Sequence, residues 1–381
     1  MLTDYITPID DHVYPTNGKP IYFYTGDDSE LDDYKVAILG VMDSRGNIEN
    51  NGCELGPDFI RKQLYLLHNF DPNLPIIDLG NIYPGQEFSD TIAALTEVVN
   101  ILNKKQIVSI ILGGDMSLTI GQYKGMKNED QMLDMVVVDE RIVIVDSEED
   151  APIHESNYIF KLFTDQPNKI NEFKLLGYQT YFNHNRDIDI LEQMNMETFR
   201  LGKLREDLME VEPLVRDADL LSFNISALKS CDAPGYAFAS PNGFFSDEAC
   251  QIMRFAGASD KLSSIGIFNF NPELDLRNIT AIGIAQMIWY FLEGITIRKA
   301  DYPIVDENNF QKFIINLEEG AHEIIFMKSK KSDRWWFQIP VFVKNSNKTI
   351  HKHISCSYND YLTAVNNEIP ERWLAAFSRI N

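Results

Sequence analysis

Short apolar runs alternate with longer amphipathic stretches over most of the chain. The runs are rich in Val, Ile and Leu and are apolar throughout, which is typical of strands that are covered on both faces. Together the two kinds of segment predict an α/β fold of three layers, with helices on both sides of a doubly wound, mostly parallel sheet. The apolar runs lie at residues 36–39, 75–80, 107–112, 135–139, 173–176, 219–224 and 264–269, and the helical spacing follows Gly56-Pro57 and recurs at 91–102, 246–257 and 278–294.

The two ends of the chain depart from this pattern. Residues 1–33 look like an irregular arm, and the alternating rhythm covers about residues 34–299. From residue 300 to 381, short strand-like runs are separated by polar turns, and a short helix is expected at the end. We interpret this segment as an α+β extension that packs on the main domain through Trp335 and Trp336.

Composition narrows the class of protein. The 381 residues are 44% hydrophobic, which suffices for a large core, and the four separated cysteines without C-x-x-C spacing favour reduced thiols over a zinc ribbon or a disulfide framework. A formal net charge of -23 repels phosphate backbones and anionic lipids, so nucleic acid and membrane surfaces are poor partners. The acidic start lacks the features of a signal peptide, and the apolar stretch Ile279–Gly294 is too short and mixed to span a bilayer. We therefore expect a cytoplasmic protein without membrane insertion.

Polar residues that end the apolar runs are the candidates for chemistry, because ligands bind at the carboxyl ends of strands in a doubly wound sheet. One run is followed by paired glycines and a carboxylate, a second ends in a carboxylate followed by an arginine, and a third ends in an amide and a hydroxyl. A further carboxylate stands in the first turn of the helix predicted at 246–257. These candidates are Asp115, Asp139, Arg141, Asn224, Ser226 and Glu248.

The order and spacing of these segments resemble the arginase, agmatinase and formimidoylglutamase superfamily, the ureohydrolases. The resemblance covers roughly residues 34–296 and implies an arginase-like fold. It is strongest to a divergent formimidoylglutamase-like branch of Bacteroidetes-type bacteria, which also shares motifs near the end of the chain. The segments that carry the resemblance are Gly52–Pro57, Ile60-Arg61, Asp78–Gly80, Gly177–Phe182, Asp333–Trp336, Cys356–Tyr358 and Glu368–Trp373.

The resemblance implies a site for two manganese ions, and here its motifs are altered. The family holds the ions with a Gly-Gly-Asp-His turn, an Asp-Ala-His-x-Asp strand end and a Ser-x-Asp-x-Asp strand end. Of these six ligands only Asp139 is retained as a charged oxygen donor. We therefore predict no cofactor for this chain. The ligand positions predicted not to bind metal are Met116, Arg141, Val143, Asn224 and Ser226.

Arg141 suggests what could replace the metal ions. Our hypothesis is that its permanent positive charge lies in the metal position and pairs with Asp139, and in addition with Asp115 or Glu248. In the alignment with the family, Glu248 matches a glutamate that faces the substrate. An outward-pointing, solvated Arg141 is the alternative, since long basic side chains are mostly exposed.

His154 lies near the position where the family has an acid/base histidine, although an ordinary loop histidine is the alternative. Together with His154, Asn224 and Ser226 are predicted to contact a ligand as neutral groups. The pair His351 and His353 has the spacing of one strand face but no clustered cysteine or carboxylate, so a surface position is favoured.

Three functions are compatible with these residues. The first is a non-catalytic relative with a binding, regulatory or assembly role, which keeps a pocket for a small cationic or amino-acid-like ligand and can self-associate or bind a protein partner. The second is a hydrolase of carbon-nitrogen bonds in formimidoylglutamate or another linear amidine or guanidino compound, which would use manganese in an altered or single-metal site. The third is metal-free hydrolysis with Glu248 or Asp115 as the base and Arg141 as the stabilising charge.

Overall fold

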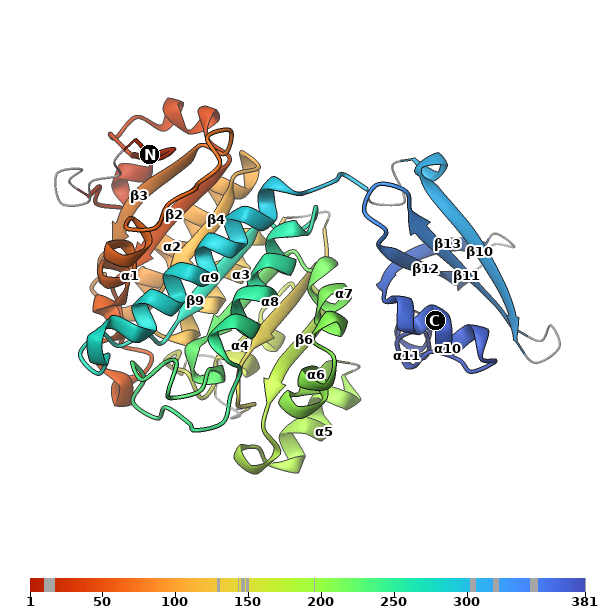
Figure 1. Ribbon diagram of the computed structural model, residues 1–381. Helices are drawn as coiled ribbons and strands as arrows, with labels where there is room; N and C mark the ends of the chain where they lie inside the picture. The colour runs from red at the N-terminus through yellow and green to blue at the C-terminus, as the bar shows by residue number, and fades with distance from the viewer. Residues whose placement is uncertain are drawn as a thin grey trace.

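Parallel strands form the centre of the main domain (Figure 1). The computed structural model describes residues 1–9, 18–128, 131–142, 144, 148, 151–194, 196–301, 306–317, 322–342 and 349–380. Within these residues a nine-stranded sheet has the order β1-β3-β2-β4-β9-β8-β5-β6-β7, and every neighbouring pair is parallel. The predicted α/β, doubly wound architecture is confirmed. The strands are β1 (Ile21–Phe23), β2 (Val36–Val41), β3 (Ile76–Ile82), β4 (Val108–Leu112), β5 (Leu133–Val138), β6 (Ile170–Tyr178), β7 (Glu197–Arg200), β8 (Leu220–Asn224) and β9 (Ser264–Phe268).

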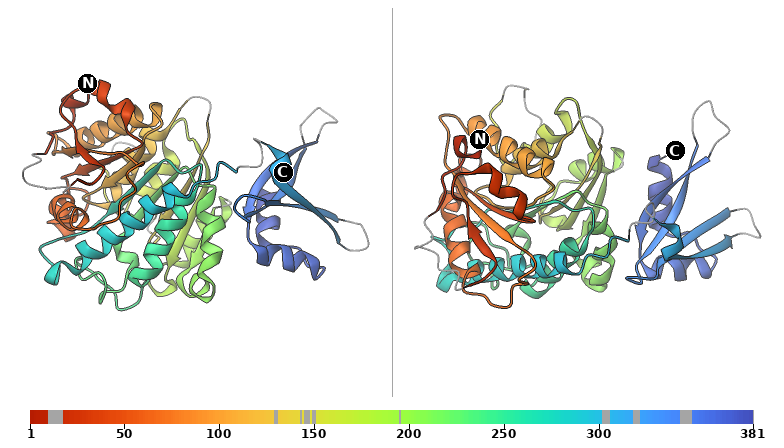
Figure 2. Two further views of the ribbon diagram at one scale, coloured as in Figure 1. Left: turned by 45° about the horizontal axis from the view of Figure 1, so that its top comes forward. Right: turned by 90° about the horizontal axis from the view of Figure 1, so that it is seen from above.

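Helices cover both faces of this sheet and make two separate apolar cores (Figure 2). Consecutive strand residues point to opposite faces, so Val36 and Ile38 pack in one core while Ala37 and Leu39 pack in the other. This is why the strands are apolar at every position. The first core contains α1 (Gly56–Leu64), α6 (Leu201–Glu206), α7 (Val211–Arg216), α8 (Ser246–Ala258) and α9 (Ile279–Thr296), and the second contains α2 (Phe88–Lys104), α3 (Thr119–Met126), α4 (Tyr158–Thr164) and part of α5 (Asn185–Gln193).

The edges of the sheet differ from the sequence-based expectation. Residues 1–33 are not only an irregular arm, because β1 pairs with β3 and Leu2 is buried in the second core. On the opposite edge, β7 was not predicted. Apart from Phe199 its residues are polar, and none of the four is buried, so an edge strand of this kind leaves no apolar run in the sequence.

The long apolar helix α9 belongs to the core. By length and composition the segment Leu276–Thr296 could cross a membrane, yet 56% of its most apolar window is buried inside the protein. It packs along α8 and against α1. A buried core helix, as the sequence predicts, accounts for its apolar character.

The carboxyl-terminal extension is a small α+β unit with its own core (Figure 1). Its antiparallel sheet has the order β10-β11-β12-β13, and two helices contribute Ala364, Trp373 and Ala376 to the core beneath it. The elements are β10 (Phe310–Leu317), β11 (His322–Ser329), β12 (Trp335–Phe342), β13 (Thr349–Cys356), α10 (Tyr358–Val365) and α11 (Glu371–Ile380).

Arg216, the last residue of α7, joins the extension to the main domain. Its Nη1 and Nη2 donate to the carbonyl oxygens of Trp335 and Cys356, at 2.8 and 3.2 Å. The guanidinium also lies 4.4 Å from the ring centroid of Trp336, and Glu212 balances its charge at 2.7 Å. The two tryptophans therefore act differently: the ring of Trp336 contacts the main domain, whereas the ring of Trp335 packs within the extension.

Candidate functional site

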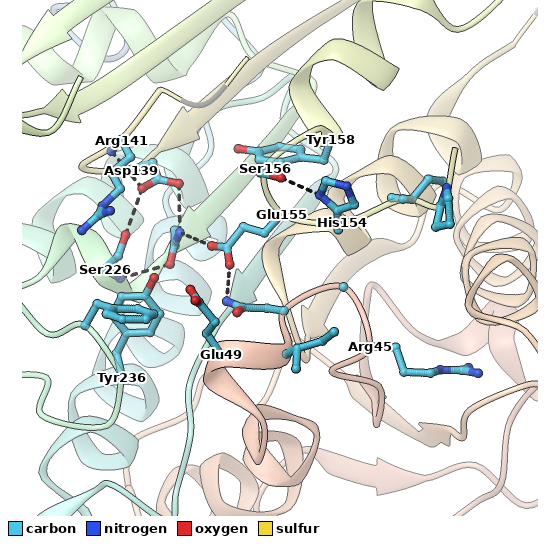
Figure 3. A pocket seen from close by; sticks show the side chains of 17 residues that line it. Arg45, Glu49, Asp139, Arg141, His154, Glu155, Ser156, Tyr158, Ser226 and Tyr236 are labelled. Carbon is cyan, nitrogen blue, oxygen red and sulfur yellow. Dashed lines mark hydrogen bonds between the residues drawn. The ribbon is translucent and has the colours of Figure 1, made fainter. Parts of the chain in front are cut away.

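A cavity of about 510 Å³ opens at the carboxyl ends of the central strands (Figure 3). Strand β5 leads directly into Asp139, and β8 ends in Asn224, so both side chains reach the same edge of the sheet. The segment before α4 adds a third wall with His154 and Glu155. The size suits a small organic molecule.

Asp139 is buried at the base of this cavity and is fully hydrogen-bonded. Its Oδ1 accepts from the Ser226 hydroxyl at 2.9 Å and from the Arg141 backbone N–H at 3.1 Å, and its Oδ2 accepts from the Asn224 amide at 2.9 Å. Burial raises the pKa of Asp139, and these donors oppose the rise. The predicted neighbours Asn224 and Ser226 thus meet Asp139, and they do so as hydrogen-bond donors.

Glu155 reaches the same point from the loop and was not predicted. Its Oε1 accepts from Asn269 at 2.7 Å and from Asn224 at 3.5 Å, and its Oε2 accepts from Asn47. One amide nitrogen, Nδ2 of Asn224, therefore bridges the carboxylates of Asp139 and Glu155. Burial, together with the negative charges of Asp139 and Asp115, raises the pKa of Glu155 to about 8.

Asp115 supports the fold beside the cavity and does not line it. Its Oδ1 caps the following turn by accepting from Ser117 N–H at 2.9 Å, and its Oδ2 accepts from Gly46 N–H at 3.1 Å. Burial raises the pKa of Asp115 to about 6. Met116, at the position of the family's histidine, is completely buried in the second apolar core.

Arg141 does not replace the metal ions as hypothesised. Its side chain turns from Asp139 to pair with Glu140 at 3.2 Å, and its guanidinium lies 4.6 Å from the ring centroid of Phe182. The side chain is 40% exposed at the rim of the cavity. An exposed position beside an aromatic ring avoids the cost of burying a guanidinium, which explains the difference.

Glu248 was also wrongly placed at the site. It belongs to a capping box, in which its Oε2 accepts from the Phe245 N–H at 2.8 Å at the start of α8. Its other oxygen accepts from Arg205 at 2.9 Å. Glu248 does not line the cavity.

His154 lines the cavity, but its ring is held by its own loop. Nε2 lies 3.1 Å from the amide nitrogen of Asn157, which donates to it, so the neutral ring carries its proton on Nδ1. That proton faces the hydroxyl oxygen of Ser156 at 2.6 Å. In this tautomer His154 cannot accept the hydroxyl proton of Ser156, and the pair is not an activated nucleophile.

Family membership follows from comparison with known proteins. The Arginase family model matches residues 34–293. The chain belongs to the arginase family. A formimidoylglutamase from Staphylococcus haemolyticus is 24% identical over 271 residues, which cover 68% of this chain and 85% of the relative. A formimidoylglutamase from Bacillus subtilis is 20% identical over 281 residues, 68% of this chain and 87% of the relative.

Solved structures of arginase-family proteins share the fold. Formiminoglutamase of Trypanosoma cruzi with manganese superposes with a TM-score of 0.65 at 17% identity, over 70% of this chain and 95% of that one. Formimidoylglutamase from Bacillus subtilis has a TM-score of 0.64 at 20% identity, over 74% of this chain and 92% of that one. Each alignment therefore covers nearly all of the known structure but leaves about a quarter or more of this chain unmatched.

The side chains in the cavity do not supply the ligands that two manganese ions, implied by the arginase family, would need. Manganese prefers six hard oxygen or imidazole ligands, and two dications need several anionic ones. Here the oxygens of Asp139 and Glu155 already accept hydrogen bonds, and Asn224 turns its N–H₂ group toward both carboxylates. Among the residues that the structure describes, no three His, Cys, Asp or Glu side chains are grouped to hold a metal. Val143 lies outside the described residues.

Among the residues that sequence reasoning missed, Glu155 and Tyr158 line the cavity, and Asn269 donates a hydrogen bond to Glu155. Glu155 directly follows His154 in the chain, but it stands at no strand end and so carried no signal of its own. Asn269 ends the last apolar run and carries a positive φ of 71°, a left-handed conformation that asparagine tolerates well. Asn269 could have been identified from the sequence because it stands at the end of a strand. Tyr158 has no comparable feature in the sequence, because it only begins a helix.

Proposed function

We propose that this chain is a non-catalytic member of the arginase family that keeps the strand-end cavity as a binding site for a small molecule. The observation that carries the proposal is the bridge from Asn224 Nδ2 to Asp139 and Glu155. A neutral amide there joins two carboxylates without supplying positive charge. Without paired dications, a water molecule in this cavity would not have its pKa lowered, and that lowering is the step that binuclear hydrolysis requires.

Glu248 and Asp115, the two candidates for the general base in metal-free hydrolysis, also lie outside the cavity. Glu248 caps α8 and pairs with Arg205, and Asp115 directs both carboxylate oxygens to its local turn and to Gly46. Neither side chain lines the cavity. Hydrolysis with either residue as general base is therefore not supported by the geometry.

The competing proposal is a hydrolase of carbon-nitrogen bonds, and one observation favours it. The relatives from Staphylococcus haemolyticus and Bacillus subtilis are formimidoylglutamases. If this chain shares their activity, a metal has to displace the amide of Asn224 from both carboxylates. The two proposals predict opposite metal contents.

A measurement of metal and turnover separates them. The purified protein is incubated with Mn²⁺, desalted, and analysed for bound manganese and for release of formamide or urea from formimidoylglutamate, arginine and agmatine. We expect neither stoichiometric manganese nor turnover. The matched variant Asn224→Asp/Ser226→Asp restores two carboxylates and should bind more manganese than the natural chain. Two bound ions and turnover in the unmodified protein would overturn the proposal.

A further inference from the structure

Acidic groups gather around the cavity without a matching cation. Asp139 and Glu155 form no ion pair within the described part of the chain, and the exposed Glu49 lines the cavity beside them. The nearby guanidinium of Arg141 pairs with Glu140 instead. Arg45, the other basic residue of the lining, is held by Asp43 at 2.6 Å and points away from the centre in Figure 3. The cavity thus presents acidic side chains that pair with no basic side chain among the described residues.

Tyr158 gives a second and independent indication of a ligand. Its side chain lines the cavity and is only 2% exposed, yet its hydroxyl has no hydrogen-bond partner among the described residues. Figure 3 shows this hydroxyl directed toward the region of Asp139. A buried hydroxyl without a partner costs free energy, and this one faces the cavity where a ligand can supply the missing hydrogen bond.

We propose that the cavity binds the ammonium group of a small amine, with Asp139 and Glu155 balancing its charge and the hydroxyl oxygen of Tyr158 accepting one of its N–H groups. This inference rests on the proposed non-catalytic function, since it places an organic cation where the family implies metal. One positive charge needs fewer anionic oxygens than two dications, and the two carboxylates here suffice. Asn224 can keep both of its hydrogen bonds while the ammonium binds.

The proposed contacts predict that the cavity binds a primary ammonium ion more tightly than a quaternary ammonium ion of the same charge. A primary ammonium has three N–H donors that can reach acceptors in different directions, such as Glu155 and Tyr158 from separate elements. A quaternary ammonium has the same charge but no N–H donor, so it leaves the Tyr158 hydroxyl without a partner. A difference in affinity between the two cations therefore reports the N–H contacts, because their charge is the same.

The experiment compares methylammonium chloride with tetramethylammonium chloride at equal ionic strength, using the full chain. Thermal unfolding and broadening of the ligand methyl signal in NMR report binding. With methylammonium about tenfold above its Kd, we expect Tm to rise by about 2 to 4 °C, and we expect no rise with tetramethylammonium. Equal effects of the two salts, or no broadening with either, would overturn the ammonium proposal.

Two variants locate the site, each with a matched control. Glu155→Gln removes a carboxyl group that can ionise to balance the ammonium and should weaken methylammonium binding by more than about tenfold, whereas Glu97→Gln on the exposed side of α2 should not change it. Tyr158→Phe should weaken binding about fivefold without lowering the Tm of the ligand-free protein, and Tyr290→Phe is its control. Binding that is unchanged in both site variants would refute the assignment.

Failure of this inference can be told apart from failure of the proposed function. If manganese and turnover are absent and methylammonium also fails to bind, only the ammonium assignment is wrong. If the unmodified protein binds two manganese ions and turns over substrate, the non-catalytic function is wrong and the ammonium assignment falls with it. Because Tyr158→Phe removes an unpartnered hydroxyl, its folding gives a check that does not depend on Glu155.

Discussion

Two buried acidic centres of the same sheet, one within a strand and one just after a strand, have opposite kinds of partner. Asp78 on β3 accepts from Arg61 Nε at 2.7 Å and Nη2 at 3.0 Å, and both side chains are fully buried. At the end of β5, Asp139 accepts from Asn224 and Ser226, and no cation accompanies it or Glu155 among the described residues. The first centre pairs its carboxylate with a cation, whereas the second brings two carboxyl groups together with neutral hydrogen-bond donors only. Both centres are buried, so what distinguishes the proposed ligand site is the lack of a partner cation rather than burial.

The largest change in stability is expected at the Arg61–Asp78 ion pair. Arg61→Ala should lower the free energy of unfolding by about 3 to 5 kcal/mol, because it leaves Asp78 buried without its cation. Urea unfolding followed by circular dichroism measures the change. The exposed Arg200→Ala serves as the control for loss of an arginine and should alter stability by less than about 0.5 kcal/mol. A small effect of Arg61→Ala would contradict the distinction between the two centres.

At the centre formed by Asp139 and Glu155, removal of an acid should stabilise the protein in a pH-dependent way. The pKa of Glu155 rises from 4.5 in the unfolded chain to about 8 in the folded one, so ionisation favours the unfolded state as pH increases between these values. Relative to the natural chain, Glu155→Gln should gain about 2 to 4 kcal/mol between pH 4.5 and pH 9, with most of the change below pH 8. Urea midpoints across this range test it. A difference that is constant with pH would show that Glu155 ionises normally.

A smaller gain is expected from the unpartnered hydroxyl. Tyr158→Phe should raise the free energy of unfolding by about 1 kcal/mol in the absence of ligand, since the buried hydroxyl has no hydrogen bond to lose. Tyr123→Phe is the contrasting variant, because Tyr123 accepts a hydrogen bond from Lys169 N–H at 2.9 Å and should lose stability. Thermal unfolding of both variants compares them. Destabilisation by Tyr158→Phe would mean that this hydroxyl already has a partner.

The smallest change in stability is expected for substitution of Arg141. The Arg141 side chain is 40% exposed, and burial raises the pKa of its partner Glu140 to about 7, so Glu140 can take up a proton when the arginine is removed. Arg141→Ala should therefore change stability by less than about 1 kcal/mol. The same unfolding assay measures it. A loss of about 3 kcal/mol or more would instead restore the hypothesis that Arg141 neutralises Asp139.

The positions of the covered central strands, and the residues that end them, were predictable from the sequence alone, whereas the edge strands β1 and β7 were not. Uninterrupted apolar runs identified the covered strands, and parallel strands bring their carboxyl ends to one edge. The sequence therefore sufficed to predict that Asp139, Asn224 and Ser226 lie together.

The directions of side chains next to those strand ends were decided only by the tertiary structure. Glu155 enters the cavity because Asn47 and Asn269, far away in the chain, donate to its carboxylate. Arg141 turns outward because Glu140 and the ring of Phe182 hold it there. Local periodicity determines where a strand ends, but the orientation of a charged side chain depends on the free energy of its burial and on partners that only the complete fold brings near.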